Sequence, residues 1–245
     1  MPTNNYQDTS EMPDVQPLPQ RRRIVLMRHG EVNYFQDGQP VAPDLAQLTE
    51  DGHTQAQAAA QTLIDVPFDA AISTGLVRTD NTLRIVLGQR NLASQTVPDL
   101  QEIRADNIGH MANLSPQEMR TMLTQAFTRS IQPDDHFLLG ETFGVFRERI
   151  VAAFRAILTD STWRCLLLVA HGATNRVILA DVFGAQLDFL GHIEQDAACI
   201  NIIDVDEHGY GILRLLNYTP YNPIKTGLSL TTMERYFLAA QSKGR

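Results

Sequence analysis

The chain has 245 residues, 43% of them hydrophobic, which is enough for the packed core of one large domain or two small ones. Its formal net charge of −8 argues against general binding to nucleic acids or to membrane surfaces, because such polyanions attract a basic surface. Lys225 and Lys243 are the only lysines, so most of the positive charge is arginine, whose planar fork suits single oxyanions.

Two further features of the composition indicate the compartment. Cys165 and Cys199 both lie in apolar runs, which favours reduced thiols in the core over a disulfide. No stretch is long and apolar enough to span a bilayer, and the N-terminus lacks the apolar centre of a signal peptide. We therefore expect a cytoplasmic protein without membrane contact.

The first elements in chain order follow a polar, proline-rich start. Residues 1–20 show no periodicity and predict a flexible tail ahead of a single domain over 21–245. The β-branched run 23–27 predicts a buried strand. The alanine- and glutamine-rich segment 48–65, with Thr49 as a cap, predicts a helix.

The middle of the chain continues this alternation. Residues 68–73 predict a second strand, 75–88 a helix closed by Gly88, and 95–100 a weaker strand. A capping box of Ser115 and Glu118 opens a predicted helix over 115–127. Apolar residues on one face predict an amphipathic helix over 141–160.

The last third begins with the most apolar predicted strand, 164–170, followed by a helix over 174–184. Residues 197–205 and 210–216 flank a Glu-His-Gly turn and predict a hairpin at the sheet edge. Residues 231–241 predict an amphipathic helix that packs on the domain or, alternatively, on a second subunit. The oligomeric state therefore stays open.

Strands that alternate with helices predict a three-layer α/β/α fold with a mainly parallel sheet and helices on both faces. The segment 104–140 breaks the alternation, and we interpret it as an irregular, partly helical insertion over the site. In such sheets ligands bind beyond the carboxyl ends of the strands. Polar residues follow four of the predicted strands there: Arg28-His29-Gly30, Arg78, Glu102 and His171-Gly172.

These residues resemble the motifs of the histidine phosphatase superfamily, which includes the phosphoglycerate mutases. "RHGE" and "AHG" follow strands, and "LTEDGHTQA", "STGLVRTDNT", "LQEI" and "GETFGVFRERI" are similar to further family segments, in family order over roughly 22–205. Each motif alone is weak, but the ordered set is specific at the level of the superfamily. The resemblance implies the phosphoglycerate mutase-like fold and phosphoryl-transfer chemistry.

Phosphoryl transfer needs an in-line nucleophile, positive charge around the phosphoryl oxygens and a proton for the leaving group. Neutral imidazole is a nucleophile near neutral pH, so His29 is our candidate for a transient phosphohistidine. The resemblance implies that Arg28 and Arg78 clamp the phosphate, and that a protonated His171 binds it. Glu102 is the candidate general acid and base, with Asp99 and Asp106 as nearby alternatives.

Each candidate has an ordinary structural alternative. His29 could cap a strand, His171 could be a core histidine bonded to a carbonyl, and Glu102 could be a surface carboxylate. A surface arginine pair contributes only ~0–1 kcal/mol, whereas an arginine on a transferring phosphoryl group is worth about 10³–10⁵ in rate. The second His-Gly decides in favour of function. We predict no metal ligands and no cofactor, since no paired Cys/His spacing or HExxH motif is present.

The sequence departs from the family pattern just after the nucleophile. Val32 stands where many relatives have serine or threonine, and Phe35 where many have asparagine, so Asn33 is a candidate substitute donor. Gly172 is a further candidate for substrate contact. Arg104, His110 and His136 are candidates for the substrate side, each with an ordinary loop residue as the simpler interpretation. These departures affect the substrate rather than the phosphate core.

Three functions fit the motifs. We rank first a metal-independent phosphatase for a small phosphorylated metabolite, with a phosphoprotein as the alternative substrate. A phosphoglycerate mutase-like phosphotransferase uses the same core residues, but the pattern around Val32 and after Glu102 departs from the mutases. A protein that only binds a phosphorylated ligand would need the clamp but not the acid.

Overall fold

The computed structural model describes residues 20–36, 39–105, 114–127 and 130–241. Its central element is a six-stranded sheet in the order β5-β4-β6-β1-β7-β8. The pairs β5/β4, β4/β6 and β6/β1 are parallel, whereas β1/β7 and β7/β8 are antiparallel. The strands are β1 Arg22–Arg28, β4 Ala70–Ser73, β5 Ser94–Thr96, β6 Cys165–Ala170, β7 Ile200–Val205 and β8 Gly211–Tyr218.

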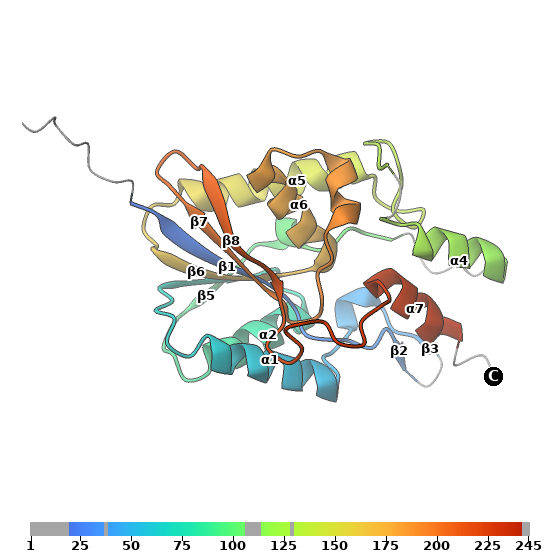
Figure 1. Cartoon of the computed structure of the whole chain (residues 1–245), viewed down its shortest axis with the longest axis horizontal. Coiled ribbons are helices and arrows are strands. Elements are labelled where there is room, and N and C mark those ends of the chain that lie inside the picture. Colours follow the sequence, from blue (N-terminus) through green and yellow to red (C-terminus); the bar gives the residue numbers. More distant parts are fainter. Residues whose placement is uncertain (1–19, 37–38, 106–113, 128–129, 242–245) are drawn as a thin grey trace, which may run out of the picture.

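Helices cover both faces of this sheet, as Figure 1 shows, with α1 and α2 on one side and α5 and α6 on the other. The prediction of an α/β fold with a mainly parallel sheet is thereby confirmed. The described helices are α1 Glu50–Thr62, α2 Val77–Leu87, α4 Pro116–Thr124, α5 Phe143–Thr159, α6 Gly172–Phe183 and α7 Thr232–Gln241. Two short strands, β2 Phe35–Gln36 and β3 Gln39–Pro40, form a separate two-stranded sheet. The 3-10 helices are Pro43–Leu45, Pro98–Leu100 and Leu187–His192.

The core consists of two apolar layers because the central strands alternate their side chains between the faces. Ile24 and Leu26 of β1 pack toward α5 and α6, in a cluster with Phe146 and Phe154. Val25 and Met27 face α1 and α2 instead. All six residues of β6 are buried, as a strand covered on both faces requires.

The end signals in the sequence act as predicted. The Thr49 side chain accepts a hydrogen bond from the backbone N–H of Gly52 and caps α1. Ser115 and Glu118 form the predicted capping box of α4. Gly184 ends α6 in the left-handed conformation. Cys165 and Cys199 are free buried thiols, as expected.

Two predicted segments differ from the structure. The strand expected over 95–100 is shorter, because β5 ends at Thr96 and Pro98, which lacks an N–H, begins a 3-10 helix. The helix expected from 174 already begins at Gly172, directly after His171. Parts of the predicted insertion 104–140 and the tail 1–19 lie outside the described residues. Within the described part of the chain, no helix combines the length and apolarity needed to cross a membrane.

Candidate active site

The ends of β1 and β6 bring two histidines together. These parallel strands pair with Arg28 opposite Ala170, so the next residues, His29 and His171, are neighbours. Their ring centroids are 5.3 Å apart. The backbone N–H of His29 donates to Ala170, 3.1 Å, and its carbonyl oxygen accepts from Ala198, 3.0 Å. The backbone of His29 is therefore fixed on both sides.

The next residue, Gly30, lies against Gly52 of α1. A Cβ atom on Gly30 would lie 2.5 Å from the carbonyl oxygen of Gly52, and one on Gly52 would lie 2.1 Å from the carbonyl oxygen of Glu31. Both distances are shorter than a Cβ atom tolerates. The two glycines thus let α1 pack directly on the loop that carries His29.

The ring of His29 is neutral and has a defined tautomer. Its Nδ1 lies 2.7 Å from the carbonyl oxygen of Gly30, which can only accept, so Nδ1 carries the hydrogen and Nε2 keeps the lone pair. Burial, together with the charges of Arg78 and Arg28, lowers the pKa of His29 well below its usual value. A buried neutral imidazole of this kind has nucleophilic character at Nε2.

The ring of His171 is neutral as well. It is fully buried, and its Nε2 lies 2.9 Å from Oγ1 of Thr74, which follows β4. Burial and the positive charge of Arg78 lower the pKa of His171 well below the ordinary value, with His29 and Arg28 adding to the effect. The family resemblance implies a protonated ring, whereas burial and the nearby positive charges favour the neutral form in the protein without ligand.

Arg28 and Arg78 are buried, with 7% and 2% exposure, which excludes the interpretation as solvated surface arginines. Arg28 donates through Nη1 to the carbonyl oxygen of Gln195, 2.6 Å, and to Thr232 Oγ1, 3.2 Å, and through Nη2 to the hydroxyl of Tyr236, 3.2 Å. Arg78 donates through Nη1 to the carbonyl oxygen of Pro43, 2.5 Å. Both guanidinium groups are thus oriented by the protein.

Three buried side-chain nitrogens in the described part of the chain have no hydrogen-bond partner: Nε of Arg28, Nε of Arg78 and Nδ1 of His171. Buried polar atoms are nearly always satisfied, and each exception calls for an explanation. All three belong to residues that the sequence motifs predict to bind phosphate. Charged guanidinium N–H groups are the donors that bind phosphoryl oxygens.

Glu102 lies at the first turn of α6. Its carboxylate accepts from the backbone N–H groups of Ile103 and Ala173, both at 3.1 Å, and of Thr174, at 3.2 Å. A Cβ atom on Gly172 would lie 3.7 Å from Glu102 Oε2 and 3.6 Å from Arg28 Nε. The carboxylate and the Arg28 guanidinium therefore flank Gly172.

Several other candidates have exposed or apolar surroundings, or belong to other elements. Asn33 and Arg104 are exposed, and the backbone N–H of Arg104 binds the carboxylate of Glu141. Val32 is buried, forms a backbone β-bridge with Leu48 and packs with it in an apolar cluster, so an apolar side chain occupies the position where many relatives have a hydroxyl. Asp99 lies in the 3-10 helix Pro98–Leu100, before Glu102. His110 and Asp106 fall outside the described residues.

No signal in the sequence marks the residues that reach the site from distant segments. Tyr34 lies near both arginines, and its ring meets that of Tyr236 edge-on at 5.3 Å between centroids. Burial and Tyr236 raise the pKa of Tyr34. Tyr236 and Thr232 belong to α7, some 200 residues from Arg28 in the chain. No local pattern marks such long-range contacts.

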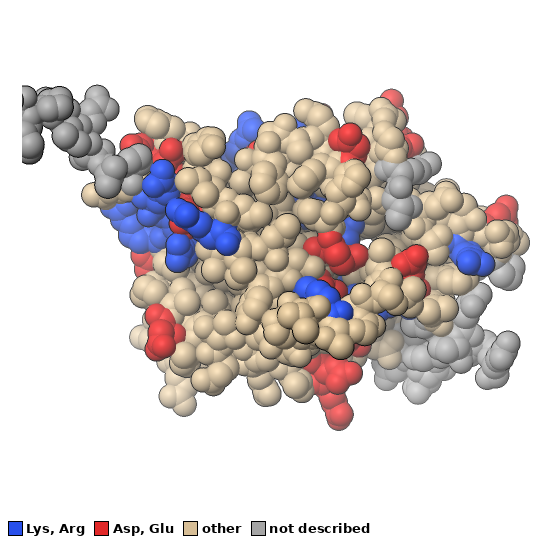
Figure 2. All heavy atoms as spheres, viewed as in Figure 1, with Lys and Arg blue, Asp and Glu red and all other residues tan. Residues whose placement is uncertain are grey.

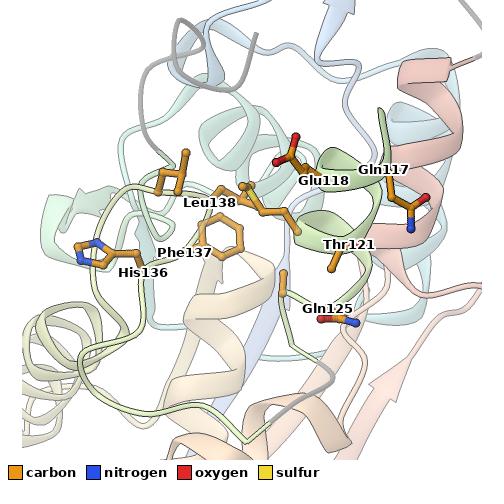
Figure 3. Close-up of a pocket in the computed structure, with 10 residues that line it drawn as sticks. Gln117, Glu118, Thr121, Gln125, His136, Phe137 and Leu138 are labelled. Carbon is orange, nitrogen blue, oxygen red and sulfur yellow. The ribbon is translucent and has the colours of Figure 1, made fainter. Parts of the chain in front are cut away.

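A separate pocket of about 420 Å³ lies between α4 and the segment 136–139 (Figure 3). His136 contributes to its wall, and its Nδ1 lies 2.6 Å from the carbonyl oxygen of Gly140. The clustered residues Arg28, His29, Arg78, Glu102 and His171 are not part of this wall. The structure therefore groups His136 with α4 and not with His29 and His171.

On the face shown in Figure 2, surface charge does not mark the site either. On the face shown in Figure 2, lysine and arginine side chains gather mainly near the start of β1, at the end of the sheet opposite to His29. The arginines beside His29 are buried instead. Within the described residues, His, Cys, Asp and Glu side chains form no group of three that could hold a metal ion.

An α/β sheet with paired histidines and buried arginines beyond its strand ends defines a protein of the phosphoglycerate mutase-like fold. The chain belongs to the histidine phosphatase superfamily (branch 1), whose family model matches residues 24–218. The resemblance in the sequence motifs is thereby confirmed.

Individual relatives are named as phosphatases. The 2-carboxy-D-arabinitol-1-phosphatase of Triticum aestivum is 26% identical over 221 residues, 86% of this chain and 44% of the relative. The chain thus spans less than half the length of this plant relative. The adenosylcobalamin/alpha-ribazole phosphatase of Escherichia coli (strain K12) is 26% identical over 199 residues, 80% of this chain and 95% of the relative. The crystal structure of the alpha-ribazole phosphatase from Shigella flexneri superposes with a TM-score of 0.64 at 25% identity, covering 80% and 96% of the two chains.

Proposed function

We propose that this protein is a metal-independent phosphatase that hydrolyses a phosphomonoester through a phosphohistidine on His29. One observation carries the proposal: Arg28, Arg78 and His171 lie beside His29, and among the described residues each of these three has a buried side-chain nitrogen without a hydrogen-bond partner. Such an arrangement suits a phosphoryl group that brings negative charge to the arginines and phosphorus to the nucleophile.

In the first step, the lone pair on Nε2 of His29 forms a bond to phosphorus while the bond from phosphorus to the ester oxygen breaks. Arg28 and Arg78 stabilise the charge on the phosphoryl oxygens. Glu102, when protonated, gives its proton to the leaving oxygen. In the second step, water attacks the phosphohistidine and gives a proton to Glu102, the nitrogen–phosphorus bond breaks, and inorganic phosphate leaves with His29 neutral again.

A small phosphorylated metabolite is the proposed substrate class. Its support is that the relatives named above act, by their names, on carboxyarabinitol and ribazole phosphates. Val32 packs with Leu48 in a small apolar cluster and has no hydroxyl at the position where many relatives have one near the nucleophile, so the substrate beyond its phosphate is proposed to differ. A panel of phosphorylated metabolites, beginning with those two, identifies the substrate.

The test uses p-nitrophenyl phosphate in the presence of EDTA, with wild type and His29→Ala. We expect EDTA-resistant release of nitrophenol by the wild type and none by the variant. If the wild type turns over no phosphate ester at all, the proposal fails. Non-catalytic binding of a phosphorylated ligand would then be the favoured function. Transfer to a second hydroxyl, with a bisphosphorylated product detected, would instead identify a mutase.

The role of Glu102 has its own test. Glu102→Gln should slow esters with poor leaving groups by about 10²–10⁴, and esters with good leaving groups far less, because a good leaving group needs no proton. Equal slowing of both kinds of ester would remove Glu102 from the role of acid, and Asp106→Asn would be measured next.

A further inference from the structure

His171 is the inner end of a buried chain of side chains that leads into α2. Its Nε2 lies 2.9 Å from Thr74 Oγ1, which lies 3.0 Å from Thr79 Oγ1. The hydroxyl of Thr79 donates to the carbonyl oxygen of Leu76, 2.8 Å. Thr74, Thr79 and His171 are each 0% exposed, so the polar side-chain atoms of this chain have only one another and the carbonyl oxygen of Leu76 as partners.

The hydrogens in this chain can be counted, because each hydroxyl has one. The hydrogen of Thr79 points to Leu76, since two buried oxygens 2.8 Å apart without a hydrogen between them would repel. Thr79 therefore accepts from Thr74. The hydrogen of Thr74 is then used, so Thr74 accepts from His171, and Nε2 of His171 must carry a hydrogen.

A neutral imidazole has a single N–H, so Nδ1 of His171 is left with a bare lone pair. Nδ1 is one of the three buried nitrogens without a partner, and the other two, Arg28 Nε and Arg78 Nε, always carry hydrogens. A phosphoryl group at this place meets two donors and one lone pair. The lone pair would repel a phosphoryl oxygen unless a proton lies between them.

We infer that binding of a phosphoryl group places a proton on Nδ1 of His171, and that Thr79, through Thr74, makes this proton obligatory by fixing the tautomer. The site thereby takes up the phosphoryl dianion together with one proton, drawn from solvent or from the substrate's own second acidic group. Thr74 and Thr79 are positioning residues that act through His171. The inference rests on the proposed function of the site.

The charged groups around His171 are consistent with a ring that is neutral in the free protein and gains a proton when a phosphoryl group binds. Arg78 faces it from α2, His29 and Arg28 from the end of β1, and Arg149 from α5. Glu102 packs against the first turn of α6, where its side-chain oxygens accept hydrogen bonds from the backbone N–H groups of Ala173 and Thr174. Burial and the positive neighbours lower the pKa of the free ring, and an incoming anion reverses that balance.

The test compares wild type with Thr79→Val, which keeps the shape but removes the hydroxyl, and with Thr79→Ser, which keeps the hydroxyl. The carbonyl oxygen of Leu76 stays satisfied in Thr79→Val, because the backbone N–H groups of residue 79 and Asp80 also donate to it. In that variant, Thr74 is free to donate to Nε2, so Nδ1 can carry the hydrogen without an added proton.

Binding of inorganic phosphate is measured by calorimetry at about pH 8 in buffers of different ionisation enthalpy. Thr79→Val should take up about one proton less per bound phosphate than wild type, and Thr79→Ser the same number as wild type. If phosphate binding also protonates His29, that contribution is the same in wild type and variants and cancels in the comparison. The hydrogen bonds from His171 through Thr74 to Thr79 do not involve the ring of His29. Equal uptake by wild type and Thr79→Val would overturn the inference.

A second measurement needs no substitution of Thr74 or Thr79. Nitrogen-15 NMR of the ligand-free wild type, assigned with His171→Gln, should show Nε2 protonated and Nδ1 bare, and both protonated with phosphate bound. A hydrogen on Nδ1 in the free protein would contradict the inference that Thr79, through Thr74, fixes the hydrogen on Nε2 of His171. Absence of phosphate binding by every protein, wild type included, would instead contradict the proposed function of the site.

Discussion

Arg149 on α5 donates through Nη2 to the backbone carbonyl oxygen of Glu102, at 3.0 Å. Its Nη1 also donates to the carbonyl oxygens of Asp99 and Gln101, and its Nε to the carboxylate of Glu141. One side chain from the helical layer thus holds the segment that presents the candidate acid.

We expect Arg149→Gln to displace this segment and to reproduce the leaving-group dependence of Glu102→Gln in weaker form. It should also lower the free energy of unfolding by about 1–3 kcal/mol, because three carbonyl oxygens, two of them part-buried, lose a charged donor. Arg155→Gln is the matched control on the same helix, since its pair with Asp181 is exposed and worth at most about 1 kcal/mol. A uniform loss of activity toward all esters would contradict the positioning role.

The two glycines near the site should respond differently to an added methyl group. In Gly172→Ala the methyl meets Arg28 and Glu102 at ordinary contact distance, so stability should be kept while it occupies the space between these groups. We expect at least a roughly tenfold loss of kcat/KM. In Gly52→Ala the methyl collides with the backbone of Glu31, and the free energy of unfolding should fall by about 1–3 kcal/mol or more. Denaturant unfolding and kinetics of both variants check this contrast.

Stability should fall as the pH is lowered from about 6.5 toward 5. The pKa values of His29 and His171 are lowered in the folded state, so the unfolded chain takes up protons below about pH 6.5 that the folded protein does not. Stability is therefore full above that pH, and each histidine removes roughly 1.4 kcal/mol per pH unit below it until its folded pKa is reached. The denaturant midpoint should depend less steeply on pH across this range in His171→Gln than in wild type. An unchanged pH dependence would contradict a lowered pKa of His171 as a cause of the stability loss.

The C-terminal helix should matter for catalysis through Arg28. Tyr236→Phe removes the acceptor of Arg28 Nη2, and we expect a loss of about 1 kcal/mol in the interaction that orients this guanidinium. That corresponds to a roughly five-fold lower kcat/KM and a weaker inhibition by inorganic phosphate. Tyr210→Phe serves as the control, because Tyr210 lies exposed in the turn between β7 and β8. Identical effects of the two substitutions would contradict the prediction that α7 supports catalysis by orienting Arg28.

The sequence by itself determined the alternation of strands and helices and the order of the family motifs. Apolar periodicity, the Thr49 and Ser115 caps and the glycine helix ends act over a few residues, so local chemistry is enough to specify them. The rule that parallel strands carry ligands at their carboxyl ends then brought His29 and His171 to one edge.

Only the tertiary structure decided which side chains complete that edge. Tyr34, Thr74 and Tyr236 come from three distant segments, and their contacts depend on packing that no local pattern records. The same holds for protonation, because burial among arginines makes His171 neutral where the motif alone suggests a charged ring. Motif order reflects the chemistry of the phosphate core, whereas desolvation and long-range contacts arise only when the layers pack together.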